Sequence, residues 1–280
     1  MTSESPAAWK VNGPTRGRLL DLQLGELWRH RELAFFFAYR DVRVRYKQAF
    51  LGISWAVIQP LAGALTFTIL FNQVADIEVE TGSYFAFAVA GFVTWNYVAA
   101  AISNGTGSLL YSGELVTKVS FPRLVVPVAS VIPGVIDLAM GLIVALVVSR
   151  STGGSLTLVG VSLLPLGLVL LIVATAGPVI FFSALTVRYR DVLVLVSFGL
   201  QILLFITPIA YPPSILSAGW RTVVFLNPVS GAVGLIRAGV IGDDPPTAAQ
   251  LALSCSVAGA VFVLGLISFR AREREFADII

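Results

Sequence analysis

Basic and aromatic residues are interleaved between residues 29 and 50, which makes this stretch the first candidate for binding chemistry. On a helix, one stripe of it is aromatic and apolar, comprising Phe35, Tyr39, Val42, Tyr46, Ala49 and Phe50. The cations that could attract anions are Arg40, Arg43, Arg45 and Lys47. Phe37 and Val44 do not fit the pattern. A helix with an aromatic side and a basic side lies in the membrane interface, so we predict an amphipathic interfacial helix rather than a surface helix of a soluble domain.

Groups that could perform catalysis are scarce. The chain has one histidine, His30, and one cysteine, Cys255, so zinc chemistry, a Ser-His-Asp site and an internal disulfide are not expected. A P-loop needs a lysine after a glycine, and none of the three lysines follows one. We therefore expect no catalytic residue, no metal ligand and no cofactor in this chain. If ATP drives its work, the ATPase is a separate chain.

Composition places these residues in a membrane protein. Of the 280 residues, 56% are hydrophobic and 12% are charged, and the mean hydropathy is +0.86. Soluble domains carry about 25% charged residues. Residues 1–28 are polar and contain no signal-peptide core, so we expect a cytoplasmic N-terminal tail, with the membrane domain over residues 29–280. The predicted fold is an all-α polytopic membrane protein.

Six segments are long and apolar enough to span a bilayer, which takes about 20 residues. They cover about 52–74, 84–110, 124–149, 156–186, 192–211 and 251–269. The fourth is over-long, and we expect it to be tilted or to kink at Gly177-Pro178.

The loop charges predict the orientation of these spans. Nine lysines and arginines precede the first span, and the alternate loops on that side carry seven more, whereas the loops on the other side carry three. Positive charge concentrates in cytoplasmic loops. We therefore predict that both termini are cytoplasmic.

Residues 212–250 are more than a simple loop. They contain two apolar pieces, 215–226 and 229–241, which are each too short to span and are separated by Asn227-Pro228. We predict a re-entrant helical hairpin that dips in from outside between spans 5 and 6 and caps an external opening. A pair of surface helices without a gating role is the alternative.

Polar residues inside the spans are candidates for a transport pathway. Asp137 in the third span must face the bundle interior, because an unpaired charge in the bilayer is costly. It either lines a path or forms hydrogen bonds between helices, and the same two interpretations hold for Gln201. The pathway candidates are Trp55, Asn96, Asp137, Gln201 and Tyr211. The aromatic members could instead belong to the interfacial belt.

Two short loops on the basic side, 111–123 and 188–191, could receive a partner protein. The first contains Glu114, Lys118 and Arg123, and we expect one or two helical turns over 114–119, ending before Pro122. The second contains Arg188, Arg190 and Asp191. These charges could also serve only to fix the topology.

Four segments in order resemble one known family, the type-2 ABC exporter permeases that handle polysaccharides. They read RYKQAFLGISWAVIQPL from Arg45, LVTKVSFPRLVVPVASV from Leu115, LTVRYRDVLVLVSFGLQILLFITPIAYP from Leu185, and LNPVSGAVGLIRAGVIG from Leu226. The resemblance covers most of the chain from about Leu33 to Phe269.

The resemblance implies a homodimeric permease that works with two copies of an ATP-binding subunit, which would hold the Mg-ATP. The substrate would be a polyprenyl-diphosphate-linked glycan of the O-antigen, teichoic acid or galactan type, exported across the bacterial plasma membrane. It implies contacts with membrane lipids and none with nucleic acid. Roles then follow for three groups of residues: headgroup recruitment by Arg40, Arg43, Arg45 and Lys47; ATPase coupling by Glu114, Lys118, Arg123, Arg188, Arg190 and Asp191; and an external gate at Pro213, Trp220, Asn227, Pro228 and Arg237.

Three other functions remain open at this point. The same architecture could export another cargo, such as a drug or a lipid. An ion-coupled secondary transporter could use Asp137 as its coupling site. A membrane enzyme of glycan assembly is disfavoured, because Asp243 and Asp244 are followed by two prolines and have no histidine or lysine nearby.

Overall fold

A computed structural model of the chain describes residues 24–47, 52–77, 79, 82–113, 121–273 and 276. These residues form helices and connecting loops, and no strand occurs among them. The helices are α1 (Leu24–Arg29), α2 (Arg31–Lys47), α3 (Trp55–Phe67), α4 (Tyr84–Tyr111), α6 (Val125–Val131), α7 (Pro133–Ser151), α8 (Leu158–Arg188), α9 (Val192–Ile206), α10 (Ala218–Val224), α11 (Pro228–Ile241) and α12 (Ala248–Arg272). Short 3-10 helices cover Gly52–Ser54 (η1) and Pro213–Ile215 (η3), and a π-helix, η2, extends α3 over Thr68–Val74.

Five apolar helical segments of the described chain are long enough to cross a bilayer, namely Gly52–Val74, Tyr84–Tyr111, Val125–Ser151, Leu158–Arg188 and Ala248–Arg272. They coincide with five of the six predicted spans, and the chain is a polytopic helical membrane protein. The third is interrupted at Ile132, where Pro133 begins α7. The fourth, α8, continues as one helix through both of its prolines.

The fifth predicted span is shorter than expected. Its helix, α9, ends at Ile206 instead of continuing to Tyr211. At 1.5 Å per residue its 15 residues cover about 22 Å, less than the roughly 30 Å of hydrocarbon. Thr207, which caps the helix, is extended, and residues 207–211 form turns and bends, so irregular chain follows where the sequence predicted continuous helix.

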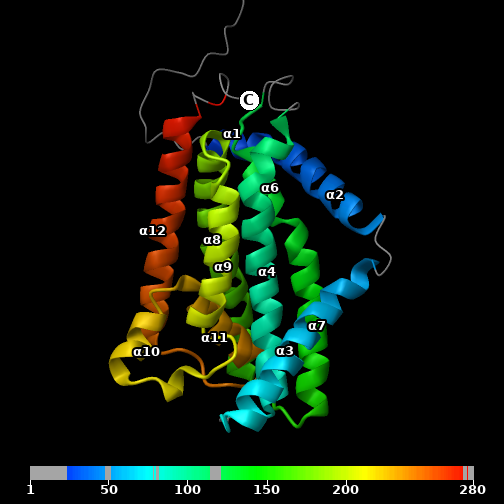
Figure 1. Cartoon of the computed structure of the whole chain (residues 1–280), viewed down its shortest axis with the longest axis vertical. Helices are drawn as coiled ribbons and strands as arrows, with labels where there is room; N and C mark the ends of the chain where they lie inside the picture. Colours follow the sequence, from blue (N-terminus) through cyan, green and yellow to red (C-terminus); the bar gives the residue numbers. More distant parts are fainter. Residues whose placement is uncertain are drawn as a thin grey trace, which may run out of the picture.

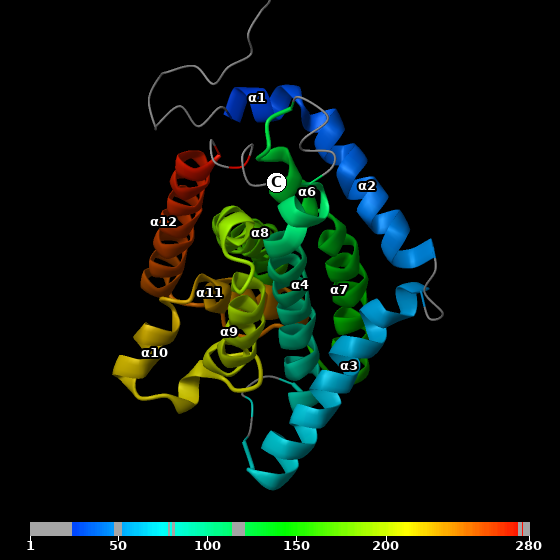
Figure 2. The same cartoon turned by 45° about the horizontal axis from the view of Figure 1, so that its top comes forward.

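The centre of the bundle consists of α4, α8 and α11 (Figures 1 and 2). Most residues of α4 are buried, and α11 is buried nearly all round among α8, α12, α4 and α7. Helices α8 and α12 can approach closely because glycines lie at their contact, as is typical of helices in membranes. An ideal Cβ at Gly177 on α8 would lie 2.9 Å from the backbone nitrogen of Phe262 on α12. One at Gly265 on α12 would lie 2.6 Å from the carbonyl oxygen of Gly177.

Helix α2 lies across one end of the bundle, as Figures 1 and 2 show. Phe35 and Tyr39 of the predicted stripe are exposed, at 70% and 56%, where lipid can cover them. Phe37, which did not fit the predicted pattern, is buried and packs against the ring of Phe121 with centroids 5.7 Å apart. The helix therefore has two apolar faces, one outward and one against α6, and the sequence pattern revealed only the outward one.

The loops alternate between the two ends of the bundle. At one end, Arg123 Nη1 donates to the carbonyl oxygen of Glu273 at 2.7 Å, which joins the segment before α6 to the end of α12. At the opposite end, Gly82, Gly154 and Gly242 lie in neighbouring loops. The first end is the arginine-rich one, as the charge pattern predicts for alternate loops.

Candidate functional site

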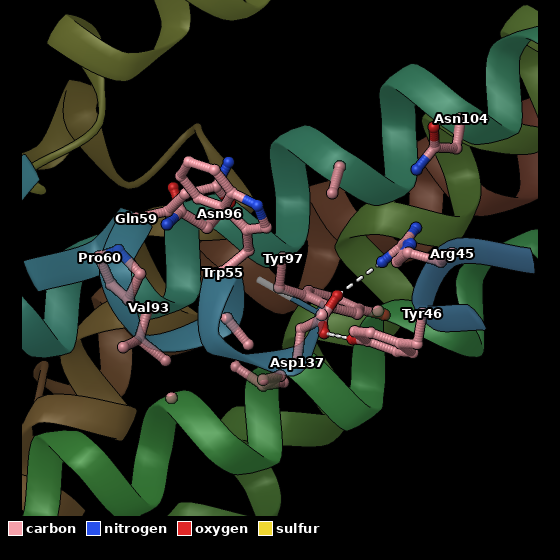
Figure 3. A pocket seen from close by; sticks show the side chains of 16 residues that line it. Arg45, Tyr46, Trp55, Gln59, Pro60, Val93, Asn96, Tyr97, Asn104 and Asp137 are labelled. Carbon is pink, nitrogen blue, oxygen red and sulfur yellow. Dashed lines mark hydrogen bonds and ion pairs between the residues drawn. The ribbon is translucent and has the colours of Figure 1, made fainter. Parts of the chain in front are cut away.

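A cavity of about 300 Å³ lies where α2, α3, α4 and α7 meet (Figure 3). Its polar and aromatic lining comprises Arg45, Tyr46, Trp55, Gln59, Asn96, Tyr97, Asn104 and Asp137. Small residues complete the walls, among them Gly52, Ala56, Ala100, Gly134 and Gly141. Three of the predicted pathway residues, Trp55, Asn96 and Asp137, therefore lie in one site, although they come from three different helices.

An ion pair closes one side of this cavity. Arg45 Nη1 on α2 lies 2.6 Å from Asp137 Oδ2 on α7, and the Tyr46 hydroxyl donates to the other carboxylate oxygen. Both charged side chains are about a quarter to a third exposed. A carboxylate near the middle of a spanning segment needs such partners, because hydrocarbon offers none. Asp137 is thus a hydrogen-bonded contact between helices and also part of a cavity wall, and its role in a transport path stays a prediction.

Two buried polar atoms at the cavity have no hydrogen-bond partner within the described part of the chain. They are Asn96 Nδ2 and the hydroxyl of Tyr97, whose side chain is 2% exposed. The Tyr97 ring is held in place by α7, since an ideal Cβ at Gly134 would lie 3.0 Å from it. Buried polar groups are normally paired, and an unpaired one costs roughly 1–3 kcal/mol.

A second hollow, of about 340 Å³, lies on the outward side of α2 and is lined by Phe36, Tyr39, Arg40, Arg43, Val44 and Lys47. Arg40 bonds to Asp41 at 2.8 Å, which offsets its charge. Arg43 and Lys47 are exposed, and among the described residues they have no ion-pair partner. This α2 hollow therefore combines two available cations with an aromatic rim.

Arg237 on α11 fixes the irregular backbone after α9. The side chain is 2% exposed; its Nη1 donates to the Pro208 carbonyl at 2.7 Å and its Nη2 to that of Ile209. The guanidinium also stacks on Phe87, 3.4 Å from the ring centroid. The Tyr84 hydroxyl donates to Ala210. Backbone that is not helical at membrane depth needs such internal donors, so this Arg237 clamp explains how α9 can end early.

Three other residues predicted for the external gate, Pro213, Asn227 and Pro228, lie near this clamp. Asn227 Nδ2 donates to the Thr207 hydroxyl at 2.7 Å, and its Oδ1 caps α11, whose first residue is Pro228. Pro213 and Arg237 line an outer cavity of about 190 Å³ that also includes Asp243 and Asp244. Trp220 on α10 is 66% exposed.

The remaining predicted residues lie elsewhere. Gln201 is exposed on α9, and the Tyr211 hydroxyl donates to the carbonyl oxygen of Ile206, so neither lines the cavity at Asp137.

The residues predicted to couple to an ATPase lie at the arginine-rich end. The Arg123 guanidinium lies 6.0 Å from the Phe276 ring centroid, and that of Arg188 lies over the Tyr189 ring. Arg190 and Asp191 are exposed at the corner between α8 and α9. Glu114 and Lys118 lie outside the described residues.

Sequence reasoning missed Tyr46, Gln59, Tyr97 and Tyr84 as site residues. The sequence pattern placed Tyr46 on the membrane-facing stripe and its neighbour Arg45 among the cations predicted to recruit lipid headgroups. One signal was available: Asp137 and Arg237 are single charges in apolar helices, and such charges need partners from other helices. Those partners are distant in sequence, at 91 residues for Tyr46 and Asp137, so spacing alone could not identify them.

Comparison with known proteins gives consistent matches. The family described as "ABC-2 type transporter" matches residues 33–241. Two similar curated proteins are named O-antigen export system permease protein RfbA. One, from Klebsiella pneumoniae, is 26% identical over 89% of this chain and 95% of its own length. The other, from Myxococcus xanthus, is 26% identical over 91% of this chain and 98% of its own length.

Proposed function

Because the chain belongs to the ABC-2 type transporter family, which it matches over residues 33–241, we propose that it is the permease subunit of an ATP-driven exporter of a lipid-linked polysaccharide. The observation that carries the proposal is the similarity to O-antigen export permeases over 95–98% of their lengths. The polytopic helical fold agrees with a transport subunit. Within this class, O-antigen, teichoic acid and galactan type polymers are the candidate cargoes, and a drug or another lipid is the alternative cargo.

The α2 hollow is the proposed recruitment site for the polyprenyl diphosphate of the substrate. Arg43 and Lys47 are exposed cations on an interfacial helix, at the depth of lipid headgroups, and Arg40 borders them. Arg45 is removed from the predicted recruitment set, because its guanidinium is engaged by Asp137. Phe36 and Tyr39, on the rim, suit the adjacent acyl region.

The energy for export comes, in this proposal, from two copies of a separate ATP-binding subunit that hold Mg-ATP. Their docking site is the arginine-rich end, with Glu114, Lys118 and Arg123 in one loop and Arg188, Arg190 and Asp191 in the other. That end faces the cytoplasm of a bacterium, with both termini in the cytoplasm and the α10–α11 hairpin outside. Alternating loop charge supports this orientation.

The permease is proposed to act as a homodimer. The C-terminal ends of helices α3 and α9 approach each other, with Phe67 and Phe205 ring centroids 6.3 Å apart. Helix α9 also exposes polar groups in its span, Ser197 and Gln201. Polar groups suit a helix interface or a wet path better than lipid, so this face fits a second copy and a glycan path between the two.

An export assay tests both the function and the recruitment site. Deleting the gene should cause lipid-linked glycan to accumulate inside the cell; the absence of any accumulation would reject the function. The double variant Arg43→Glu/Lys47→Glu should lower export at least about tenfold, because reversed charges repel a diphosphate. The matched control is Arg150→Glu, an exposed arginine at the far end of α7. Normal export by the double variant would reject headgroup recruitment while leaving the transport function intact.

A further inference from the structure

We propose that the cavity between α2, α3, α4 and α7 binds a neutral sugar ring of the exported glycan within a single protomer. This inference rests on the proposed function and deepens it. The cavity and the α2 hollow then bind different parts of the substrate. The cavity binds the hydroxyl groups and the ring face of a sugar, and the α2 hollow binds the diphosphate.

The charges of the cavity favour a neutral ligand. Its two ionic side chains, Arg45 and Asp137, are paired with each other at 2.6 Å and cancel. An anion would meet the Asp137 carboxylate, and a cation would meet the Arg45 guanidinium. On the outward side of the same helix, Arg43 and Lys47 are not offset in this way. The last turns of α2 thus separate a neutral polar site from a cationic one.

The polar lining matches sugar hydroxyls. Gln59, Asn96 and Asn104 each present an amide, which donates through nitrogen and accepts through oxygen, as two adjacent hydroxyls require. Figure 3 shows Trp55, Gln59 and Asn96 gathered at one end of the cavity and Arg45, Tyr46 and Asp137 at the other. Trp55 adds an aromatic face that is about half exposed, at 47%. Such a face can cover the C–H face of a pyranose.

Two orphan atoms at the cavity are free to form hydrogen bonds with a polar ligand. Asn96 Nδ2 and the Tyr97 hydroxyl are buried at the cavity without a partner among the described residues. The two residues are consecutive on α4, and the Tyr97 ring is buried and held against Gly134. Separate hydroxyls of one sugar ring could pair with them. The volume of about 300 Å³ is at the lower end of ligand pockets, which run from about 300 to 1,000 Å³, and suits a single ring.

The test measures how much a sugar adds to lipid binding by the full-length permease in nanodiscs. The probes are undecaprenyl diphosphate alone and the same lipid carrying one glucose, galactose, mannose or N-acetylglucosamine. For the wild-type chain, at least one sugar should increase the affinity about tenfold or more. Asn96→Ala and Trp55→Ala should each remove most of that increase and leave binding of the sugar-free lipid unchanged. Trp55→Phe, which keeps an aromatic face, should retain part of it.

Matched controls separate this result from a folding defect. Trp28→Ala removes an exposed tryptophan on α1, and Asn72→Ala removes an amide on η2; both lie outside the cavity and should keep the full sugar increase. The free methyl glycosides of the same four sugars are the second arm, and should compete with the sugar-bearing lipid for wild type but not for Asn96→Ala. This arm distinguishes a sugar from a lipid headgroup as the occupant.

Two results would overturn the sugar site. One is that no sugar raises the affinity of the wild-type chain, and the other is that Asn96→Ala and Trp55→Ala weaken both lipids equally. Either result leaves the export assay untouched, so the failure of this site and the failure of the transport function can be told apart.

Discussion

At the scale of single residues, two charges in apolar helices show how this chain accommodates ions at membrane depth. Asp137 is paired with Arg45 and accepts a hydrogen bond from Tyr46, both on α2, and Arg237 donates to two backbone carbonyls and stacks on an aromatic ring. The Arg45 ion pair accounts for the position of Asp137 without a role in ion coupling. The need for partners could be predicted from the sequence. The identity of these partners could not be predicted, because they are distant in the sequence.

Removing the Arg237 side chain should be costly for the fold. Arg237→Met leaves the Pro208 and Ile209 carbonyls without a donor, and we expect a loss of about 3 kcal/mol in the free energy of unfolding. Arg237→Lys should recover only part of the loss, because one ammonium cannot replace a fork that reaches two carbonyls and stacks on Phe87. Denaturant titration in mixed micelles measures this. A loss no larger than that of Arg150→Met, an exposed control, would contradict the clamp.

At the scale of elements, the sequence predicted where most helices lie but not which faces they bury. Hydropathy and length identified the five long spans, because that signal lies within each segment. The early end of α9 depends on donors from α4 and α11, which no local pattern contains. The inner face of α2 was missed for a similar reason: Phe37 is recognised as a core residue only when Phe121 lies against it.

Close packing of α8 on α12 can be tested with two glycines of the same helix. Gly265→Ala would place a Cβ 2.6 Å from the Gly177 carbonyl, and we expect it to destabilise the protein by about 1–3 kcal/mol. Gly259→Ala meets no atom within 4 Å, and should stabilise α12 by about 0.5–1 kcal/mol. The same titration reads out both variants. Equal effects of the two substitutions would show that α8 and α12 do not approach as closely as described.

At the scale of the whole molecule, charge and hydropathy predicted the arrangement of the two ends. The loops that carry most of the basic residues lie at one end of the bundle, where Arg123 contacts the end of α12. The loops with few basic residues lie next to one another at the other end of the bundle. The cavity between α2 and α7 was beyond reach of the sequence, because a cavity depends on the relative positions of four helices. Its residues could be proposed one at a time, but not as one site.

The orientation of the molecule is testable with single cysteines. In a Cys255→Ser background, Ser151→Cys at the end of α7 should react with a membrane-impermeant maleimide in intact spheroplasts. Ala271→Cys at the end of α12 should react only after the membrane is permeabilised, because the arginine-rich end is expected inside. Both positions are exposed, so access alone does not distinguish them. The reverse labelling pattern would mean that the basic end faces outward.

The burial of α11 has a consequence for how the chain is made. With 14 residues, about 21 Å, this helix cannot cross a bilayer, and it carries a charge that lipid would not tolerate. Its cover includes α12, which is synthesised after it. During membrane insertion, the side of α11 that packs on α12 therefore stays uncovered until α12 has been synthesised. A nascent chain that stops before α12 would leave the face of α11 at Gly231, which packs on Ser254 of α12, open to lipid or to quality-control proteases, so this protein completes its core late.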